Sequence, residues 1–406
     1  MKIKFTGSIA YILVLFLFSL SYSIDWQAKT AMPTARSFGG AATIGESLYV
    51  VGGRNSSGLL ATLDIYDIIS DSWSAGSSLP VPIREFGVGA VNGNIYVIGG
   101  YDGTNVLDSV FEYVPTIDTW STKSSMPTPR EGLAIAVLDD KIYAIGGDDG
   151  INTMNNVEEY DPTNDIWTTK TAMSTSRTSL TAQNVGDKIY AIGGCTSGVT
   201  PCGTVEEYDP SGDDWTAKTS MPTARYGLAS GVVEGKVYLL GGFAPVSTIY
   251  SVVEYYEPSL DTWNSETAML TARWGLVVDT LDGKLYAIGG QTLFHSGYTG
   301  ANEEGTVLVG IVEQHLSDSK NPLQIQPMPF KDRVHIFLND EMKSTEIKIY
   351  NIAGRLVRSL PFGNASVNHI SWDRTDETGE RLPSGVYILR LETFEETVTR
   401  KLLILP

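Results

Sequence analysis

The feature that most constrains the fold of this chain is a phrase that returns at a fixed interval. The eight residues DKIYAIGG occupy positions 140–147 and occur again at 187–194. Looser copies end in the same glycine pair, and the second glycines are spaced by 47, 47, 47, 48 and 48 residues. They are Gly53, Gly100, Gly147, Gly194, Gly242 and Gly290. A regular period in the forties indicates one supersecondary unit that is repeated and stacked.

A tryptophan follows the same spacing, and four short apolar runs lie in each unit. In the third unit these runs read GLAIAVL, KIYAIGG, VEEY and IWTTK. Each has the length and the Val, Ile, Tyr and Trp content of a β-strand, and Gly, Asp, Asn or Pro separates it from the next. Four antiparallel strands in about 47 residues are predicted to form one blade of a β-propeller. The tryptophans are Trp26, Trp73, Trp120, Trp167, Trp215 and Trp263.

The combined pattern IYxIGG, VExYDPxxxxW and MPxxR resembles the kelch repeat. Six copies extend over residues 24–316, which implies an all-β, six-bladed kelch-like propeller. Two copies depart from the pattern: the first reads DIYDIISDSW, and the last, VLVGIVEQHL, has no tryptophan after it. Trp26 precedes the first glycine pair, so we expect Ile24–Met32 to supply the fourth strand of the sixth blade. The N-terminal strand would then close the propeller and leave no free sheet edge.

The N-terminus has the pattern of a secretory signal peptide. Two lysines precede an apolar run from about Ile9 to Leu20, and Ser-Tyr-Ser provides small residues for cleavage after Ser23. The alternative is an uncleaved membrane anchor, for which this apolar run is short. We therefore expect residues 1–23 to be removed, and the mature protein to be exported with no membrane span.

Charge and cysteine content narrow the partners further. Residues 24–316 hold 15 basic and 35 acidic side chains, so this region repels nucleic acid and anionic membranes. The only cysteines, Cys195 and Cys202, follow the fourth glycine pair. In an exported protein, two close cysteines are expected to form a disulfide. A zinc site needs about four ligands, and no histidine or second cysteine pair lies near them.

The repeats end near Leu316, and a different architecture follows. Residues 317–325 form a polar, proline-containing linker, and residues 326–406 contain alternating strand patterns that predict a small antiparallel β-sandwich. The segments QPMPF, IYNIAGRLVRSL, SWDRTDETGERLPSGVYILRLET and TRKLLILP resemble the type A C-terminal sorting domain of the type IX secretion system. Arg374 stands where that family usually has glycine, and Met328 where it usually has asparagine.

That resemblance implies an Ig-like sorting domain, related to an Ig-like module of flagellar hook-capping proteins. It also implies the type IX secretion machinery as a partner. The chain would then be secreted or attached to the surface of a Gram-negative bacterium. The alternative is a passive Ig-like spacer.

Six arginines in the Met-Pro-type turns are the first candidate site residues. In an antiparallel blade these turns share one face, called here the mouth, with the loops that follow the glycine pairs. Two roles are open for them. They can form structural pairs with Asp64, Glu158, Glu206 and Glu254, with Phe111 replacing the acid in blade two, or they can bind an anionic ligand. The arginines are Arg36, Arg84, Arg130, Arg177, Arg225 and Arg273.

Residues next to these arginines differ from blade to blade, as expected for a binding surface on a repeated scaffold. Tyr226 and Trp274 lie on adjacent blades, where they can form an aromatic platform for a sugar ring or a peptide side chain. Gln183 and Asp279 are polar exceptions on the inner strands, and we expect them to face the channel.

Few catalytic constellations fit this sequence. A copper site would have only His295 and His315 in the propeller, and the Ser-x-Asp-x-Gly-x-x-Trp motif of sialidases is absent. The alternative function is that of an enzyme resembling the six-bladed kelch-like sialate epimerases. In that case Glu85 and Glu131 of this chain would act as acid and base. The sequence predicts a module that binds a protein or glycan at the mouth, without cofactor or metal, with the epimerase as the alternative.

Overall fold

The computed structural model describes residues 18–196, 200–244, 248–313, 323–326, 329–338, 346–351, 355–361, 369–392 and 397–405. These residues form strands, turns and one short 3-10 helix, η1 (Pro115–Ile117). The chain divides into a unit of Leu20–Ile311 and a second unit that contains Val312–Pro406. The expected signal peptide up to residue 17 and most of the expected linker 317–325 lie outside the described residues.

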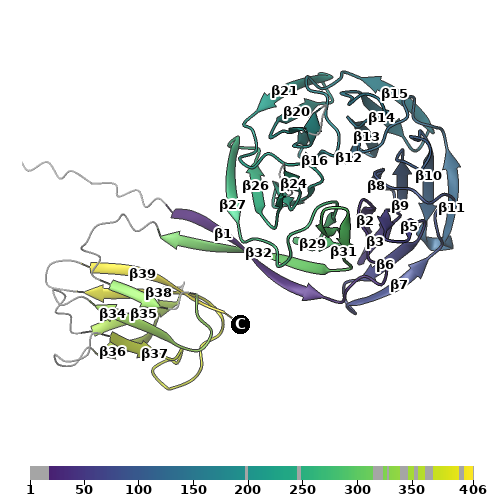
Figure 1. Ribbon diagram of the computed structural model, residues 1–406. Coiled ribbons are helices and arrows are strands. Elements are labelled where there is room, and N and C mark those ends of the chain that lie inside the picture. Colours follow the sequence, from purple (N-terminus) through teal and green to yellow (C-terminus); the bar gives the residue numbers. More distant parts are fainter. Residues whose placement is uncertain are drawn as a thin grey trace, which may run out of the picture. The chain divides into compact units, whose positions relative to one another are not determined.

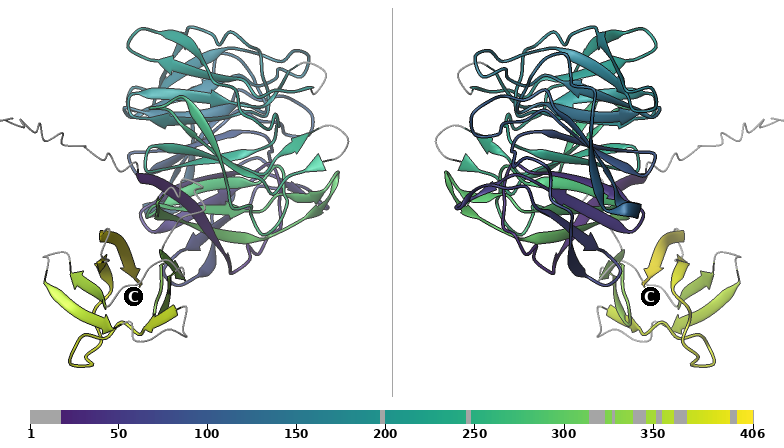
Figure 2. Two further views of the ribbon diagram at one scale, coloured as in Figure 1. Left: turned by 90° about the vertical axis from the view of Figure 1, so that its left-hand side faces the viewer. Right: turned by 90° about the vertical axis from the view of Figure 1, so that its right-hand side faces the viewer.

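The first unit is a six-bladed β-propeller, as the repeat predicted. Six four-stranded antiparallel sheets surround a central channel, with the first strand of each sheet innermost (Figure 1). Seen from its sides, the propeller has the sheets of successive blades stacked against one another (Figure 2). The first five blades are β2 (Gly40–Ile44), β3 (Ser47–Val51), β6 (Leu63–Asp67) and β7 (Ser72–Gly76); β8 (Gly87–Val91), β9 (Asn94–Ile98), β10 (Val110–Val114) and β11 (Thr119–Lys123); β12 (Ala134–Leu138), β13 (Lys141–Ile145), β14 (Val157–Asp161) and β15 (Ile166–Lys170); β16 (Thr181–Val185), β17 (Lys188–Ile192), β20 (Val205–Asp209) and β21 (Asp214–Lys218); and β22 (Ala229–Val233), β23 (Lys236–Leu240), β26 (Val253–Glu257) and β27 (Thr262–Glu266).

The sixth blade joins the two ends of the propeller. It consists of β28 (Val277–Leu281), β29 (Lys284–Ile288), β32 (Asn302–Glu313) and, as its fourth strand, β1 (Phe18–Lys29). Trp26 is buried in β1, and its indole nitrogen donates to the carbonyl of Thr267 at 2.9 Å. A Cβ atom on Gly305 of β32 would lie 2.8 Å from the Trp26 ring, so this glycine makes room for it. The predicted closure by the N-terminal strand is therefore confirmed, although β1 begins at Phe18, ahead of Ser23.

The glycine pairs join neighbouring blades. In every blade the second glycine donates its N–H to a backbone carbonyl of the next blade, at 2.7–3.0 Å, and the sixth blade completes the circle by donating to Arg36. A Cβ on the first glycine of each pair would lie within 2.4–3.1 Å of that same carbonyl. Both glycines also have positive φ values. The pair is repeated because only glycine permits this backbone conformation and this close approach. The first glycines are Gly52, Gly99, Gly146, Gly193, Gly241 and Gly289.

The C-terminal unit contains two antiparallel sheets that share one apolar core. Arg374 has a φ of 55°, which explains why related domains use glycine there. Its buried guanidinium group donates to the carbonyls of Lys331, Leu382 and Leu405 and so ties the end of the last strand to two loops. One sheet is β33 (Leu323–Gln326), β34 (Val334–Leu338) and β37 (His369–Trp372); the other is β36 (Leu356–Pro361), β35 (Glu346–Asn351), β38 (Gly385–Glu392) and β39 (Thr397–Ile404).

Closure by β1 leads to a test of stability. We expect Trp26→Ala to lower the free energy of unfolding by about 3–5 kcal/mol, because a large buried side chain is lost where the two ends of the propeller meet. Gln27→Ala, an exposed neighbour on the same strand, is the control and should change little. Urea unfolding of the three proteins measures both effects. Equal stability of all three would show that β1 does not close the propeller.

Candidate functional site

Five of the six candidate arginines lie in the interior of the propeller. Their side chains are at most 2% exposed, and each donates to the carbonyl of the first glycine of its own blade. Each also pairs with a buried carboxylate of the same blade. Burial lowers the pKa of every one of these guanidinium groups, and the paired carboxylate opposes that shift. The pairs are Arg36–Asp64, Arg130–Glu158, Arg177–Glu206, Arg225–Glu254 and Arg273–Glu303.

These contacts place the five arginines in a structural role. A guanidinium group that is buried and paired with one carboxylate and several carbonyls has no surface to offer a ligand, even though the Nε atoms of Arg130, Arg177 and Arg273 have no hydrogen-bond partner among the described residues. The expectation of a six-membered arginine ring that binds an anion at the mouth therefore does not fit their position. The structural alternative does.

In blade two, Arg84 does not hold the position of the buried arginines, contrary to the expectation from the sequence. The buried position lies 17 residues before the second glycine, and in blade two it holds Ile83 rather than Arg84. Gly53 donates to the carbonyl of Ile83 at 2.7 Å, as the other second glycines do to the buried arginines. Ile83 and Phe111, both buried, replace the arginine and its acid. An apolar pair thus substitutes for the ion pair, which is physically acceptable when both partners change together.

Arg84 consequently occupies the mouth position that follows the buried residue. In each blade this position forms an isolated antiparallel bridge with the residue after the glycine pair, so the two side chains lie on the same face. The six bridges differ in chemistry although the backbone beneath them is repeated. They are Ser37–Arg54, Arg84–Tyr101, Glu131–Asp148, Thr178–Cys195, Tyr226–Phe243 and Trp274–Gln291.

A second closed circle of backbone hydrogen bonds surrounds the mouth. One residue per blade donates its N–H to the carbonyl of the corresponding residue in the preceding blade, at 2.7–3.0 Å. All six have φ values between 53° and 62°. Three are glycines, whereas blades one, two and four hold side chains in this left-handed conformation, at a cost of about 1–2 kcal/mol each. The residues are Phe38, Glu85, Gly132, Ser179, Gly227 and Gly275.

Blades two and three form a charged sector of the mouth. Arg84 forms ion pairs with Glu85 and with Glu131, the latter at 3.6 Å between Nη2 and Oε2, and its guanidinium lies 4.9 Å from the centre of the Tyr101 ring. Burial raises the pKa of Glu131 to about 7, and the nearby carboxyl groups of Glu85 and Asp148 add to the shift against the opposing effect of Arg84. The two glutamates proposed as acid and base are thus brought together.

Blades five and six, with one residue of blade one, form an aromatic sector. Trp274 is only 7% exposed, and the rings of Phe38, Tyr226, Phe243 and Phe294 surround it with centroids 4.9–6.3 Å away. The Trp274 ring is therefore part of an aromatic cluster rather than an open platform. Phe294 stacks on it at an interplanar angle of 13° and is itself 45% exposed. Tyr226 is partly buried beside it.

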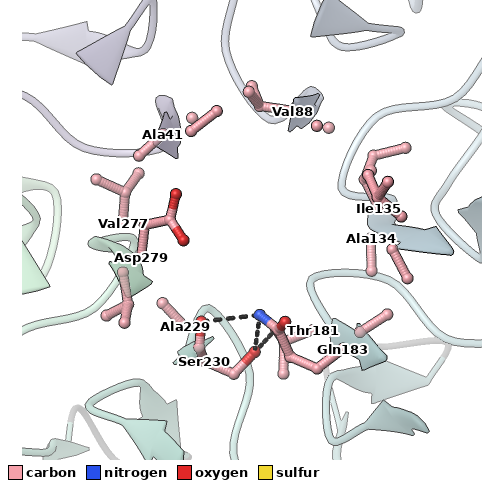
Figure 3. A pocket seen from close by; sticks show the side chains of 18 of the residues that line it. Ala41, Val88, Ala134, Ile135, Thr181, Gln183, Ala229, Ser230, Val277 and Asp279 are labelled. Carbon is pink, nitrogen blue, oxygen red and sulfur yellow. Dashed lines mark hydrogen bonds between the residues drawn. The ribbon is translucent and has the colours of Figure 1, made fainter. Parts of the chain in front are cut away.

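Gln183 and Asp279 line the central channel, whose volume is about 470 Å³ (Figure 3). The Gln183 amide donates to the carbonyl and the hydroxyl of Ser230, and the hydroxyl of Thr43 donates to Asp279 at 2.8 Å. Burial raises the pKa of Asp279. Much of the remaining wall consists of glycine, alanine and branched apolar residues of the inner strands. The channel offers one polar arc on the side of blades four to six.

The expected disulfide is wrong, because Cys195 and Cys202 are both free thiols. In the hairpin of β18 (Cys195–Thr196) and β19 (Thr200–Pro201), Cys195 lies opposite Pro201. Cys202 is one residue beyond that register, so its side chain is expected on the other face of the hairpin. Its thiol donates to the carbonyl of Gly193 at 3.4 Å, the same carbonyl that accepts from the buried Arg177. Burial raises the pKa of the Cys195 thiol to about 12.

Sequence reasoning missed several residues of the mouth. Phe38, Arg54, Tyr101, Gln291 and Phe294 were not among the candidates, although the fixed distance to each glycine pair identifies four of them. Among the described residues, no three His, Cys, Asp or Glu side chains are grouped as a metal site. No helix in the described part of the chain is long and apolar enough to cross a membrane.

Comparisons with known proteins agree with the repeat and with the C-terminal unit. The Kelch motif matches residues 129–174, 176–222 and 224–270, and the KLHDC2/KLHL20/DRC7 Kelch-repeats domain matches residues 11–147. The Secretion system C-terminal sorting domain matches residues 324–405. A solved structure titled "Structure of YjhT" is similar over 70% of this chain and 99% of its own, with a TM-score of 0.61 and 17% identity, which supports the fold alone. No curated protein matches the chain.

The raised pKa of Glu131 predicts a specific pH dependence. Between about pH 4.5, the ordinary value of a glutamate, and pH 7, the folded state retains a proton that the unfolded state has lost. This carboxyl therefore makes the free energy of unfolding fall as pH rises through that window and contributes no further slope above it. In Glu131→Gln the contribution is absent, so the variant should gain stability relative to the wild type from pH 5 to pH 7.5.

Urea unfolding at several pH values measures this difference. Glu46→Gln, which changes an exposed glutamate in a hairpin of blade one, is the matched control. A difference between Glu131→Gln and the wild type that stays constant from pH 5 to 7.5 would contradict the raised pKa.

Proposed function

The chain carries kelch repeats and a secretion system C-terminal sorting domain, and we propose that it is an exported module that binds a protein or glycan at the propeller mouth. The sorting domain indicates export by the type IX secretion system to the cell surface or the surroundings. We further propose that residues 1–23 are a cleaved signal peptide and that the host cell is a Gram-negative bacterium. The type IX machinery is then the partner of the C-terminal unit.

One observation carries the choice of the mouth as the binding surface. The backbone there is repeated six times in closed circles of hydrogen bonds, but the six bridged residue pairs all differ. If the mouth served stability alone, we would expect the same side chains in every blade, as beneath it with the arginine–carboxylate pairs. A rigid scaffold with variable tips is instead what a specific binding surface requires.

The left-handed positions add weight to this proposal. Phe38 and Glu85 occupy positions where glycine would adopt the same φ without steric cost. Phe38 belongs to the aromatic sector of the mouth and Glu85 to the charged sector. Backbone strain of this kind persists where a side chain is needed for something other than folding. The mouth thus presents charged groups on one side and aromatic groups on the other.

The alternative, a sialate epimerase-like enzyme, rests on the carboxyl pair alone. Burial raises the pKa of Glu131 to about 7, so this carboxyl group can donate or accept a proton near neutral pH beside a second carboxyl group. Turnover of N-acetylneuraminate anomers, followed by NMR, tests this possibility. Acceleration by the wild type that Glu131→Gln abolishes would establish an enzyme, and its absence leaves binding as the function.

The binding proposal is tested by ligand capture followed by variants of the mouth. The mature chain is screened on a glycan array and in pull-downs from surface material, and every ligand is measured again with Glu85→Gly. This substitution relieves the left-handed strain of about 1–2 kcal/mol but adds the flexibility of glycine, so the free energy of unfolding should stay within about 1 kcal/mol of the wild type. Affinity should change for a ligand that reaches the charged sector, and Phe38→Gly makes the same backbone change in the aromatic sector, so every ligand of the mouth should respond to one of the two variants.

Two matched controls make the result specific. Ser179→Gly makes the same backbone change in blade four, where the side chain is small, and should retain affinity. Ile69→Ser alters an exposed apolar residue in the β6–β7 turn, on the face opposite the mouth. Ligands that lose affinity with Ile69→Ser but respond to neither Glu85→Gly nor Phe38→Gly would overturn the proposal that the mouth is the binding surface.

A further inference from the structure

Unpartnered buried polar groups gather at the joint between blades six and one. The Gln291 side chain is fully buried, yet neither its amide nitrogen nor its amide oxygen has a hydrogen-bond partner among the described residues. The indole nitrogen of Trp274, the hydroxyl of Ser37 and the Nε of Arg54 share this condition. Buried polar atoms in folded proteins are almost always paired, so four such residues in one place call for an explanation.

The bridges show that these groups belong together. Gln291 pairs with Trp274 and Arg54 pairs with Ser37, so each pair directs its side chains to one face. Phe38 connects the two pairs, because its ring lies 4.9 Å from Trp274 and 5.5 Å from the guanidinium of Arg54. An uninterrupted series of contacts therefore runs from Arg54 across Phe38 and Trp274 to Phe294.

Arg54 differs from the other arginines of the propeller. Five are buried in ion pairs, and Arg84 pairs with Glu85 and Glu131. Arg54 is partly exposed and forms no ion pair within the described part of the chain. An unpaired guanidinium at the mouth of a domain with a net charge of −20 is a favourable position for an anionic group.

From these contacts we infer that the joint of blades six and one binds the carboxylate of an acidic peptide segment, with an apolar residue beside it. This inference rests on the proposed function and specifies its ligand. Arg54 is partly exposed, and the buried Ser37 hydroxyl, Trp274 indole and Gln291 amide offer further donors once the exposed Phe294 ring moves away, which suits the acceptor oxygens of a carboxylate. One guanidinium with neutral donors in an acidic domain favours a single negative charge over a phosphate.

The aromatic side chains at this joint favour a peptide over a sugar acid. They are Phe38, Trp274 and Phe294, and the exposed Leu293 adjoins them. A sugar can stack its C–H faces on such rings, but its hydroxyls also need polar partners beyond those that hold the carboxylate, whereas Leu or Phe of a peptide needs only apolar area to bury. Phe294 lies in the turn between β30 (Gln291–Leu293) and β31 (Ser296–Tyr298), and its exposed ring covers Trp274. The apolar residue of the peptide takes the place of that ring.

An array of N-acetylated, C-amidated pentapeptides tests the inference with the full mature chain. The central residue is Asp, Glu, Asn or Gln, and the flanking residues are varied. We expect the wild type to prefer Asp or Glu flanked by Leu or Phe over the Asn or Gln counterpart by about tenfold or more, the effect of one charge-assisted hydrogen bond. In Arg54→Gln this preference should fall below about twofold, with an unchanged melting temperature.

A second variant separates a binding role of Gln291 from a structural one. Gln291→Leu replaces an unpartnered buried amide with an apolar group of similar size, so folding should be preserved or improved. Peptide affinity should nevertheless fall by about fivefold or more, since a hydrogen bond to a charged group is lost. Unchanged peptide affinity in Gln291→Leu would remove Gln291 from the site.

Three outcomes would overturn the inference. The wild type can show no preference for acidic over amide peptides, or the preference can survive in Arg54→Gln. Oligosaccharides of hexuronic acids can bind where the peptides do not, which would assign this joint to glycans. None of these outcomes affects the proposed function if captured ligands still respond to Glu85→Gly or Phe38→Gly, so the two proposals fail separately.

Discussion

The buried arginine–carboxylate pair is the interaction on which the blade depends. In five blades one guanidinium group joins the turn that enters the blade, the glycine pair that ends the second strand, and the acid on the third strand. The backbone carbonyl of the same arginine accepts the N–H from the second glycine of the preceding blade. One residue thus fixes the interior of its own blade and the contact with its neighbour.

This arrangement separates stability from function within a single short turn. The buried residue is constrained by a charge partner and by carbonyls, while the residue that follows it reaches the mouth and is free to differ. Ser37, Arg84, Glu131, Thr178, Tyr226 and Trp274 therefore vary on top of an almost invariant layer. The charged sector, the aromatic sector and the unpartnered donors near Arg54 all result from this freedom.

Much of the fold was predictable because it depends on spacing. A period of 47 or 48 residues defined the blades, and the displaced Trp26 predicted closure by β1 from the count of tryptophans alone. The candidate site was harder. Arg84 is adjacent to the buried position and follows its tryptophan by one residue more than the buried arginines do, so Arg84 resembles the buried arginines although its distance to Gly100 places it at the mouth. Proximity in sequence also suggested a bond between Cys195 and Cys202, but the hairpin register separates their side chains.

The unpartnered donors were beyond sequence reasoning for a physical reason. Whether Gln291 finds a hydrogen-bond partner depends on what the neighbouring blade places beside it, and this contact joins residues that lie about 250 positions apart in the chain. Likewise, the raised pKa of Glu131 results from burial beside Glu85, which only the assembled circle of blades creates. Local patterns predict the scaffold, whereas contacts between blades determine the chemistry of the mouth.

The role of the arginines is tested most directly by replacing the ion pair of blade three with the apolar residue pair of blade two. Arg130→Ile alone leaves Glu158 buried without its partner, and Glu158→Phe alone leaves Arg130 unpaired, so each should lower the free energy of unfolding by about 3–5 kcal/mol. The double variant recreates the Ile83–Phe111 pair and should recover most of that loss in urea unfolding. Single variants as stable as the wild type, with no coupling between the two positions, would contradict the claim that these arginines hold the blades together.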